Sequence, residues 1–81
     1  MWLAEIFVKP KKNILDPQGE VIKKTLGSLG YKKIEDVKQG KYFQVLINEK
    51  ARPVATVKKM CEQLLVNQII EDYSFKLEKI K

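Results

Sequence analysis

Residues 21–37 (VIKKTLGSLGYKKIEDV) and residues 56–73 (TVKKMCEQLLVNQIIEDY) are two versions of one pattern. Each carries a lysine pair near its start, continues through two leucines and reaches an Ile-Glu-Asp triplet, which begins at Ile34 in the first copy and at Ile70 in the second. Self-similarity over a few tens of residues indicates a repeated supersecondary unit, here a helix followed by a strand. The repeat therefore predicts architecture, and it carries no chemistry of its own.

The first half of the chain begins with a predicted strand over residues 2–9, whose apolar side chains fall on both of its faces. Such a pattern suits a central strand, or a strand whose second face is covered by a partner. A helix is predicted to start at Asp16 and Pro17, because aspartate at the N-cap accepts a backbone N–H and proline is tolerated at the first helical position. Gly30 stands where a left-handed C-terminal cap is expected. The apolar positions of this helix are Ile22, Leu26 and Leu29.

A hairpin is predicted next, with a short strand over residues 34–38 and a return strand over residues 41–48. Gln39 and Gly40 would form its tight turn, since glycine supplies the positive φ that hairpin turns need. Phe43 and the residues alternating with it would face one side of the return strand, and Tyr42 and Leu46 the other.

The second helix is predicted to open at Pro53 and to end near Asn67. Its apolar side chains recur with the period of an α-helix: Val54, Val57, Met60, Cys61, Leu64 and Leu65. A last strand over residues 69–78 alternates apolar and polar side chains. Its inward-facing residues would be Ile69, Tyr73, Phe75 and Leu77.

The resulting order, β-α-β-β-α-β, predicts an α+β fold in one domain over residues 1–81. Two right-handed crossovers would place both helices on one face of a four-stranded antiparallel sheet, a ferredoxin-like sandwich. The other face would be left open, with Tyr42 and Leu46 pointing to it. Because a contiguous apolar patch rarely stays in water, we expect a homodimer or a larger homo-oligomer built partly through the sheet.

The composition excludes several classes of protein. A hydrophobic fraction of 44% with 32% charged residues is ordinary for a globular protein, and no apolar run is long enough to cross a bilayer. The start of the chain has no basic segment of the kind that opens a signal peptide. The net charge of +6 comes almost entirely from lysines spread along the chain, with Arg52 the one arginine. This charge fits either a solvated surface or a site for an anionic partner.

The residues that usually carry catalysis are scarce. Histidine is absent, and Cys61 is the single cysteine, which fits a reducing cytosol and falls in the apolar stripe of the second helix. The glycines match no phosphate-binding loop. Glu35-Asp36 and Glu71-Asp72 are adjacent carboxylate pairs, whose members would point to opposite faces of a strand. They fit either solubilising residues or contacts to another chain, and we expect no catalytic residue, metal site or cofactor.

Gly19 is the residue of the first helix that capping alone does not explain. Glycine in the first turn costs about 1 kcal/mol relative to alanine. It also lets another backbone or a ligand approach the N–H groups at the start of the helix. The segment around it therefore has two interpretations, a capped helix start and a contact surface.

Five motifs stand out along the chain: residues 14–19 (ILDPQG), 26–31 (LGSLGY), 36–41 (DVKQGK), 60–67 (MCEQLLVN) and 70–73 (IEDY). Together they resemble the PurS family, the small subunit of phosphoribosylformylglycinamidine synthase. The resemblance covers nearly the whole chain in order and spacing. It departs at Asn13, where the family often has glycine, and at Gln68, where it often has proline. Asn13 still permits a left-handed turn, and Gln68 would loosen the entry into the last strand.

The resemblance implies a cytoplasmic, non-catalytic subunit in the fourth step of purine synthesis. In that family a large subunit performs the ATP-dependent amidation, a glutaminase subunit releases ammonia, and the small subunit is thought to bridge the two and assist ammonia transfer. We expect neither a membrane nor a nucleic acid as a partner. Contacts with the two enzyme subunits are expected at seven positions: Asp16, Gln18, Gly19, Lys41, Asn67, Glu71 and Asp72.

Two other functions share this predicted topology. An RNA-binding module of the RRM type would carry stacking aromatics on its third strand, but Tyr42 and Phe43 are adjacent and would face opposite sides. A regulatory domain for a small molecule has no sequence feature in its favour. Salt-dependent RNA affinity tighter than non-specific binding would support the first of these.

Overall fold

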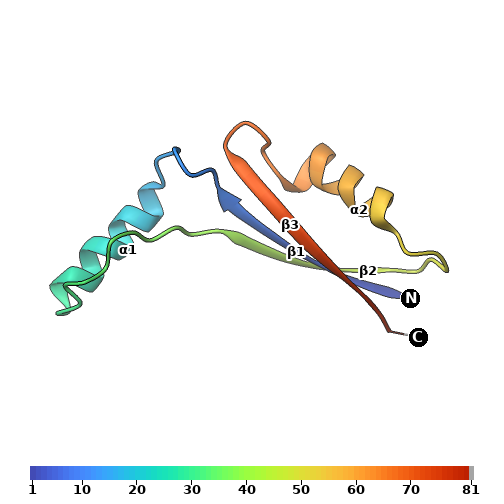
Figure 1. Cartoon of the computed structure of the whole chain (residues 1–81), viewed down its shortest axis with the longest axis horizontal. Coiled ribbons are helices and arrows are strands. Elements are labelled where there is room, and N and C mark those ends of the chain that lie inside the picture. The colour runs from blue at the N-terminus through green and yellow to red at the C-terminus, as the bar shows by residue number, and fades with distance from the viewer. Residues whose placement is uncertain (81) are drawn as a thin grey trace.

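The structure, a computed structural model, describes residues 1–80. Three strands and two helices follow one another in the order β1, α1, β2, α2, β3, with a short π-helical turn, η1, continuing α2 (Figure 1). Their bounds are β1 Trp2–Pro10, α1 Pro17–Ser28, β2 Lys41–Ile47, α2 Val54–Met60, η1 Cys61–Leu65 and β3 Glu71–Lys79.

The strands form one antiparallel sheet in the order β2-β1-β3. The predicted central position of the first strand is confirmed, since Ile6 of β1 lies opposite Phe43 on one side and Phe75 on the other. Alternate residues of β1 are buried, and the residues between them face the open side of the sheet. The buried core consists of Ala4, Ile6, Val8, Val57, Cys61 and Val66.

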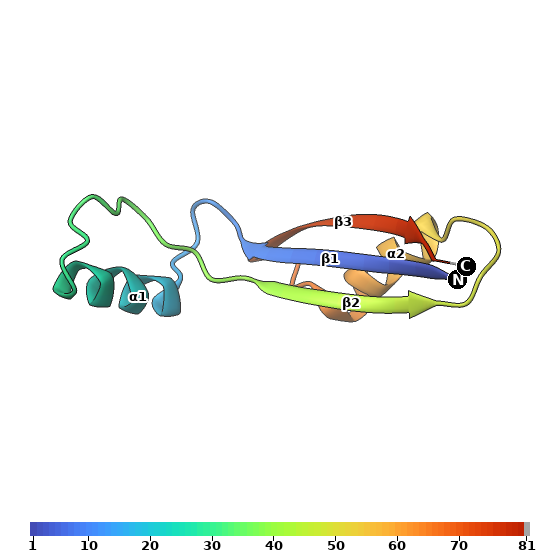
Figure 2. The same ribbon diagram turned by 90° about the horizontal axis from the view of Figure 1, so that it is seen from below.

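The helix α2 and the turn η1 cover one face of the sheet (Figure 2). The predicted burial of Val57 and Cys61 is confirmed, since both have no exposed surface. The α-helical stripe is wrong at Leu64, which is 83% exposed. The backbone N–H of Val66 donates to the carbonyl of Cys61, five residues back, so the last turn is wider than an α-helix and rotates Leu64 outward. Ile69, predicted to face inward, lies in the turn before β3 and is exposed.

The first helix does not cover the sheet. Figures 1 and 2 show α1 beyond the end of the strands, with residues 31–40 running back along it. No residue of α1 belongs to the core. We call residues 11–40 the arm. The Cα radius of gyration is 16.2 Å, against about 12 Å for a compact chain of this length.

The placement of the arm makes two predictions wrong. The sheet described here has three strands instead of four, because residues 34–38 form no strand. Gln39 and Gly40 form no hairpin turn, and the chain runs extended through them into β2 (Figure 2). The physical reason is that residues 31–40 stay beside α1, away from the outer edge of β2 with which a hairpin strand would pair.

Glycine still has a structural role at both predicted positions. Gly30 has φ 104°, which confirms the left-handed residue expected after α1. Gly40 has no positive φ in the structure. Glycine is needed there because the backbone of β1 passes close to it. A Cβ on Gly40 would lie 2.2 Å from the carbonyl oxygen of Val8 in β1. Among residues 1–80, no helix is long and apolar enough to span a membrane.

Candidate functional site: the junction of the arm and the sheet

Four of the seven predicted contact residues meet in one hollow where the arm joins the sheet: Asp16, Gln18, Lys41 and Glu71. The hollow has a volume of about 430 Å³. It lies at the sheet end where β1 ends and β2 and β3 begin, so segments distant in sequence converge there. Its other lining residues are Pro10, Ile14, Leu15, Pro17, Gln39, Gly40 and Ile70. We call this the junction hollow.

Asp16 holds the two crossing segments of the junction together. Its Oδ2 accepts a hydrogen bond from the backbone N–H of Gln39 at 2.7 Å, and the residue is buried. Asp16 occupies the predicted N-cap position, but its carboxylate bonds the returning chain instead of capping α1. The hydrogen bond from Gln39, with nearby N–H groups of α1 and the charge of Lys38, lowers the pKa of this carboxyl below 3.8. Asp16 is therefore a charged clasp inside the arm.

Gly19 is explained by a close approach within the chain. It is the one buried residue of α1, and a Cβ there would lie 2.2 Å from the carbonyl oxygen of Val37 and 2.7 Å from Oδ2 of Asp16. The sequence left open whether this glycine admits another backbone, and the backbone it admits is that of residue 37. Gly19 is buried, and its contact with another protein stays a prediction.

Lys41, Asn67 and Glu71 form a second connected group at the same end of the sheet. Lys41 Nζ lies 3.4 Å from Glu71 Oε2 across β1, and Glu71 Oε1 accepts the backbone N–H of Asn67 at 2.8 Å. The side chain of Asn67 in turn accepts the N–H of Ile69 at 3.1 Å. Glu71 is thus mostly used within the chain, while the Lys41 side chain remains 57% exposed.

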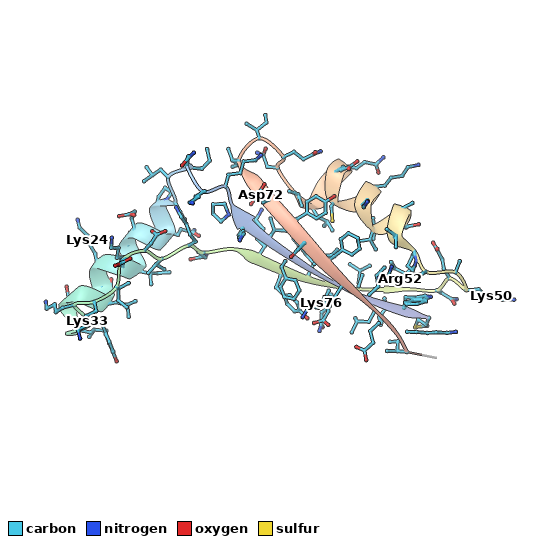
Figure 3. The ribbon with its side chains drawn as sticks, in the orientation of Figure 1. Lys24, Lys33, Lys50, Arg52, Asp72 and Lys76 are labelled. Atoms are coloured by element: carbon cyan, nitrogen blue, oxygen red, sulfur yellow. The ribbon has the colours of Figure 1, made fainter. Side chains whose placement is uncertain are left out.

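Asp72, the last predicted contact residue, lies apart from this group. It lies at the start of β3 (Figure 3). Its Oδ1 is 3.7 Å from Nζ of Lys11. Both side chains are exposed, so the pair contributes little to stability and stays available to a partner.

The sequence did not indicate that Val37 and Gln39 contact the start of α1. Their contacts with Gly19 and Asp16 join residues about twenty positions apart through backbone atoms. Backbone atoms have no side-chain pattern, and the one available signal was the unexplained Gly19.

The lowered pKa of Asp16 gives a prediction with a defined sign. Its stabilising contribution is present above the ordinary carboxyl pKa of 3.8 and is lost as the pH falls through the lower folded value. The wild-type protein should therefore lose thermal stability on acidification below 3.8 more steeply than Asp16→Asn. Thermal unfolding over the acid range measures this. Asp36→Asn is the matched control, because its carboxylate makes only a 4.0 Å surface contact with Lys38. Parallel profiles for wild type and Asp16→Asn would contradict the assignment.

The open face of the sheet carries both apolar and polar side chains, and these contact one another. Phe7 and Tyr42 lie side by side on it with ring centroids 5.2 Å apart, and Lys76 Nζ lies 5.9 Å from the Phe7 ring. The Tyr42 hydroxyl donates to Glu5, which raises the pKa of that hydroxyl. This face is available for a protein partner, with Phe7 39% and Leu46 61% exposed.

This arrangement is poorly suited to stacking RNA bases. Tyr42 is exposed, whereas Phe43 packs against the core, which confirms that the two aromatics face opposite sides. A Glu5 carboxylate bound to the Tyr42 hydroxyl places negative charge where a phosphate backbone would approach. The basic side chains are also dispersed. Figure 3 shows Lys24 and Lys33 on the arm and Lys50 and Arg52 beyond the opposite end of the sheet.

Cys61 has the environment of a structural residue. It is fully buried in the core between α2 and the sheet, and desolvation raises the pKa of its thiol. A raised pKa keeps the less nucleophilic thiol form at neutral pH. Within residues 1–80, no group of three His, Cys, Asp or Glu side chains could hold a metal ion.

The fold is that of a small α+β protein with a three-stranded antiparallel sheet, an arm outside the core and a hollow at their junction. A family model described as "PurS: Phosphoribosylformylglycinamidine (FGAM) synthase" matches residues 3–79. The chain belongs to the PurS family.

Individual relatives agree with this over nearly their whole length. The chain is 38% identical to phosphoribosylformylglycinamidine synthase subunit PurS of Bacillus subtilis, covering 99% of this chain and 96% of that protein. A solved structure of B. subtilis PurS is similar with a TM-score of 0.89 at 39% identity, covering 98% of this chain and 100% of the other. A chain of the Thermotoga maritima PurLQS structure gives a TM-score of 0.73 at 26% identity, covering 96% and 99%.

Proposed function

We infer that this chain, a PurS subunit of phosphoribosylformylglycinamidine synthase in purine biosynthesis, is the non-catalytic member that bridges the glutaminase and the ATP-dependent synthetase in the cytoplasm. It acts as a homo-oligomer and assists the passage of ammonia between the two. The observation that carries this proposal is the likeness, over nearly all of both chains, to a chain of the T. maritima PurLQS structure.

The chemistry of the chain fits a supporting role. Its one thiol is buried, and the carboxylates of the junction are engaged with backbone N–H groups and lysines. These groups hold the protein's own segments in place, so they are not poised for proton transfer to a substrate. Catalysis then belongs to the partners, and this chain supplies surfaces.

Ammonia transfer gives such surfaces a purpose. In water at neutral pH most ammonia is protonated, and the resulting ammonium ion is not a nucleophile. A glutaminase that releases ammonia is useful to a synthetase only if the path between them excludes water. Contacts at the junction hollow and the open sheet face would hold the two enzymes close enough for such a path.

Co-elution tests the bridging role. The chain, the glutaminase and the synthetase are mixed pairwise and together, with and without glutamine and ATP, and separated by size exclusion with light scattering. We expect glutaminase and synthetase to form one complex only when the chain is present. A variant with Lys41→Glu and Asp72→Lys, which reverses two exposed charges of the predicted contact set, should weaken that complex. Lys50→Glu, at the far end of the sheet, is the control. A stable complex of the two enzymes without the chain would contradict the proposal.

A further inference from the structure

The lysines are spread along the chain, but the acidic residues are not. Residues 21–34, which we call the arm tip, contain Lys23, Lys24, Lys32 and Lys33 and no aspartate or glutamate. The other 12 of the 16 basic residues are nearly balanced by the 10 acidic ones. Most of the net charge of +6 therefore lies in this one segment. Such a concentration of one sign attracts an oppositely charged partner over about 10 Å at 0.1 M salt.

The arm tip lies at one extreme of the molecule. The molecule is 50 Å long, and Figure 1 shows the end of α1 and the start of the returning segment at the extreme opposite the chain termini. Lys24 and Lys33 belong to this outer part of the arm (Figure 3), and both are exposed. Within residues 1–80 neither of them forms an ion pair. Their charges are therefore available to a partner.

One lysine of the arm tip has a role in the fold. Lys32 Nζ donates to the carbonyl oxygen of Gly27 at 2.8 Å, near the C-terminal end of α1. A cation at this position also offsets the negative end of the helix dipole. The stability of α1 therefore accounts for Lys32, and it leaves the charges of Lys24 and Lys33 unexplained.

The second copy of the repeat shows that folding does not need this charge. When the two Ile-Glu-Asp triplets are aligned, Lys32 and Lys33 stand opposite Gln68 and Ile69, so the second copy has only one lysine pair. It also contains Glu62, whereas the arm tip has no acidic residue. The copy that packs on the sheet thus folds without the charge that the arm tip carries.

An aromatic side chain and a hollow lie beside these lysines. Tyr31 is 59% exposed, and it lines a hollow of about 300 Å³ with Gly30, Lys32, Lys33 and Ile34. Tyrosine is enriched in protein interfaces. The arm tip has no arginine, the residue favoured for phosphate and base recognition. These features fit an acidic protein surface better than a nucleic acid. A second copy of the chain fits poorly, because it carries the same net charge.

We propose that the arm tip docks against an acidic surface of one enzyme of the synthase, with Tyr31 in the contact and Lys24 and Lys33 steering the two proteins together. The proposal rests on the bridging role proposed above and adds to it a surface and the charge of its occupant. The length of α1, about 18 Å for 12 residues, separates the arm tip from the junction hollow. One enzyme can therefore bind the tip while the other binds at the sheet.

Association kinetics test this proposal. The variant with Lys24→Glu and Lys33→Glu reverses two charges of the arm tip. The control with Lys58→Glu and Lys59→Glu makes the same change in net charge at exposed lysines of α2, in the second copy of the repeat. Binding is followed by biolayer interferometry on immobilised glutaminase and on immobilised synthetase, each with and without the other enzyme in solution. Glutamine and ATP are present, and circular dichroism checks that the variants fold.

We expect the arm-tip variant to lose about tenfold in the association rate constant for one enzyme at low salt, while the control changes little. The difference should vanish near 1 M salt, where the Debye length is about 3 Å. If reversal prevents folding, glutamine replaces glutamate at the same positions, and a smaller loss is expected. Tyr31→Ala should instead raise the dissociation rate constant, because it removes a contact and no charge.

Three results would overturn the proposal and leave the bridging role intact. An equal loss in both variants would mean that only the overall charge matters, and no loss in either would mean that the arm tip makes no contact. The third is tighter binding of a single-stranded RNA oligonucleotide than of either enzyme, lost only in the arm-tip variant, which would make the occupant a nucleic acid. If the wild-type chain binds neither enzyme, the docking proposal and the bridging role both fail.

Discussion

Replacing Gly19 by alanine is expected to lower the free energy of unfolding by about 3 kcal/mol, because the added methyl group has no space. It would lie 2.2 Å from the carbonyl oxygen of Val37 and 2.7 Å from the Asp16 carboxylate. Two backbone segments must then separate, and the hydrogen bond from Gln39 to Asp16 is strained at the same time. The clash should outweigh the better helix propensity of alanine, which favours folding by only about 1 kcal/mol.

Gly27→Ala is the matched control in the same helix. A Cβ at Gly27 would have no atom within 4 Å, so the propensity gain remains without a clash. We expect this variant to be more stable than wild type by about 0.5–1 kcal/mol. Denaturant unfolding at one fixed protein concentration measures both variants, since oligomer stability depends on concentration. Equal effects of the two substitutions would show that the backbone of Val37 does not cross α1 at Gly19.

Replacing Ile6 by alanine is the second change with a large expected effect, a loss of about 2–5 kcal/mol in the free energy of unfolding. Ile6 has no exposed surface and lies on the central strand, between Phe43 and Phe75. Its truncation leaves a cavity in the middle of the core, where the neighbouring strands cannot close without breaking their ladders.

Phe7→Ala is the adjacent control on the opposite face of the same strand. Phe7 is 39% exposed and contacts Tyr42 and Lys76 on the open face. Its loss should cost about 1–2 kcal/mol, mainly from one aromatic pair and partial burial. Both variants are measured in the isolated chain by urea unfolding. A larger loss for Phe7→Ala than for Ile6→Ala would mean that the two faces of the sheet have been assigned the wrong way round.

The sequence was sufficient for five of the six predicted elements, but it predicted a strand over residues 34–38 that does not form and it misplaced α1. The alternation of β1 and the helical stripe through Val57 and Cys61 depend on local periodicity, and the structure has both. The position of α1 depends on Gln39 and Gly40, whose sequence fits a hairpin turn. Glycine adopts an extended conformation as readily, and the contact that decides between the two is the hydrogen bond from Gln39 to the distant Asp16.

The candidate site was also predictable only in part. Asp16, Gln18, Lys41 and Glu71 converge because they stand at the beginnings of elements that meet at one end of the sheet. The hydrogen bonds that occupy them could not be predicted, since Glu71 bonds a turn whose geometry depends on Asn67. The exposure of Leu64 could not be predicted either, because the π-helical turn interrupts an apolar stripe that is continuous in the sequence.

The most direct test of the central claim is reconstitution of the synthase from its separate parts. Formylglycinamidine ribonucleotide formation is measured with glutaminase and synthetase, with and without this chain, using glutamine or an ammonium salt as the nitrogen source. We predict that glutamine-dependent synthesis requires the chain, while ammonium-dependent synthesis by the synthetase proceeds without it. Full glutamine-dependent activity in the absence of the chain would contradict its role as the bridging subunit.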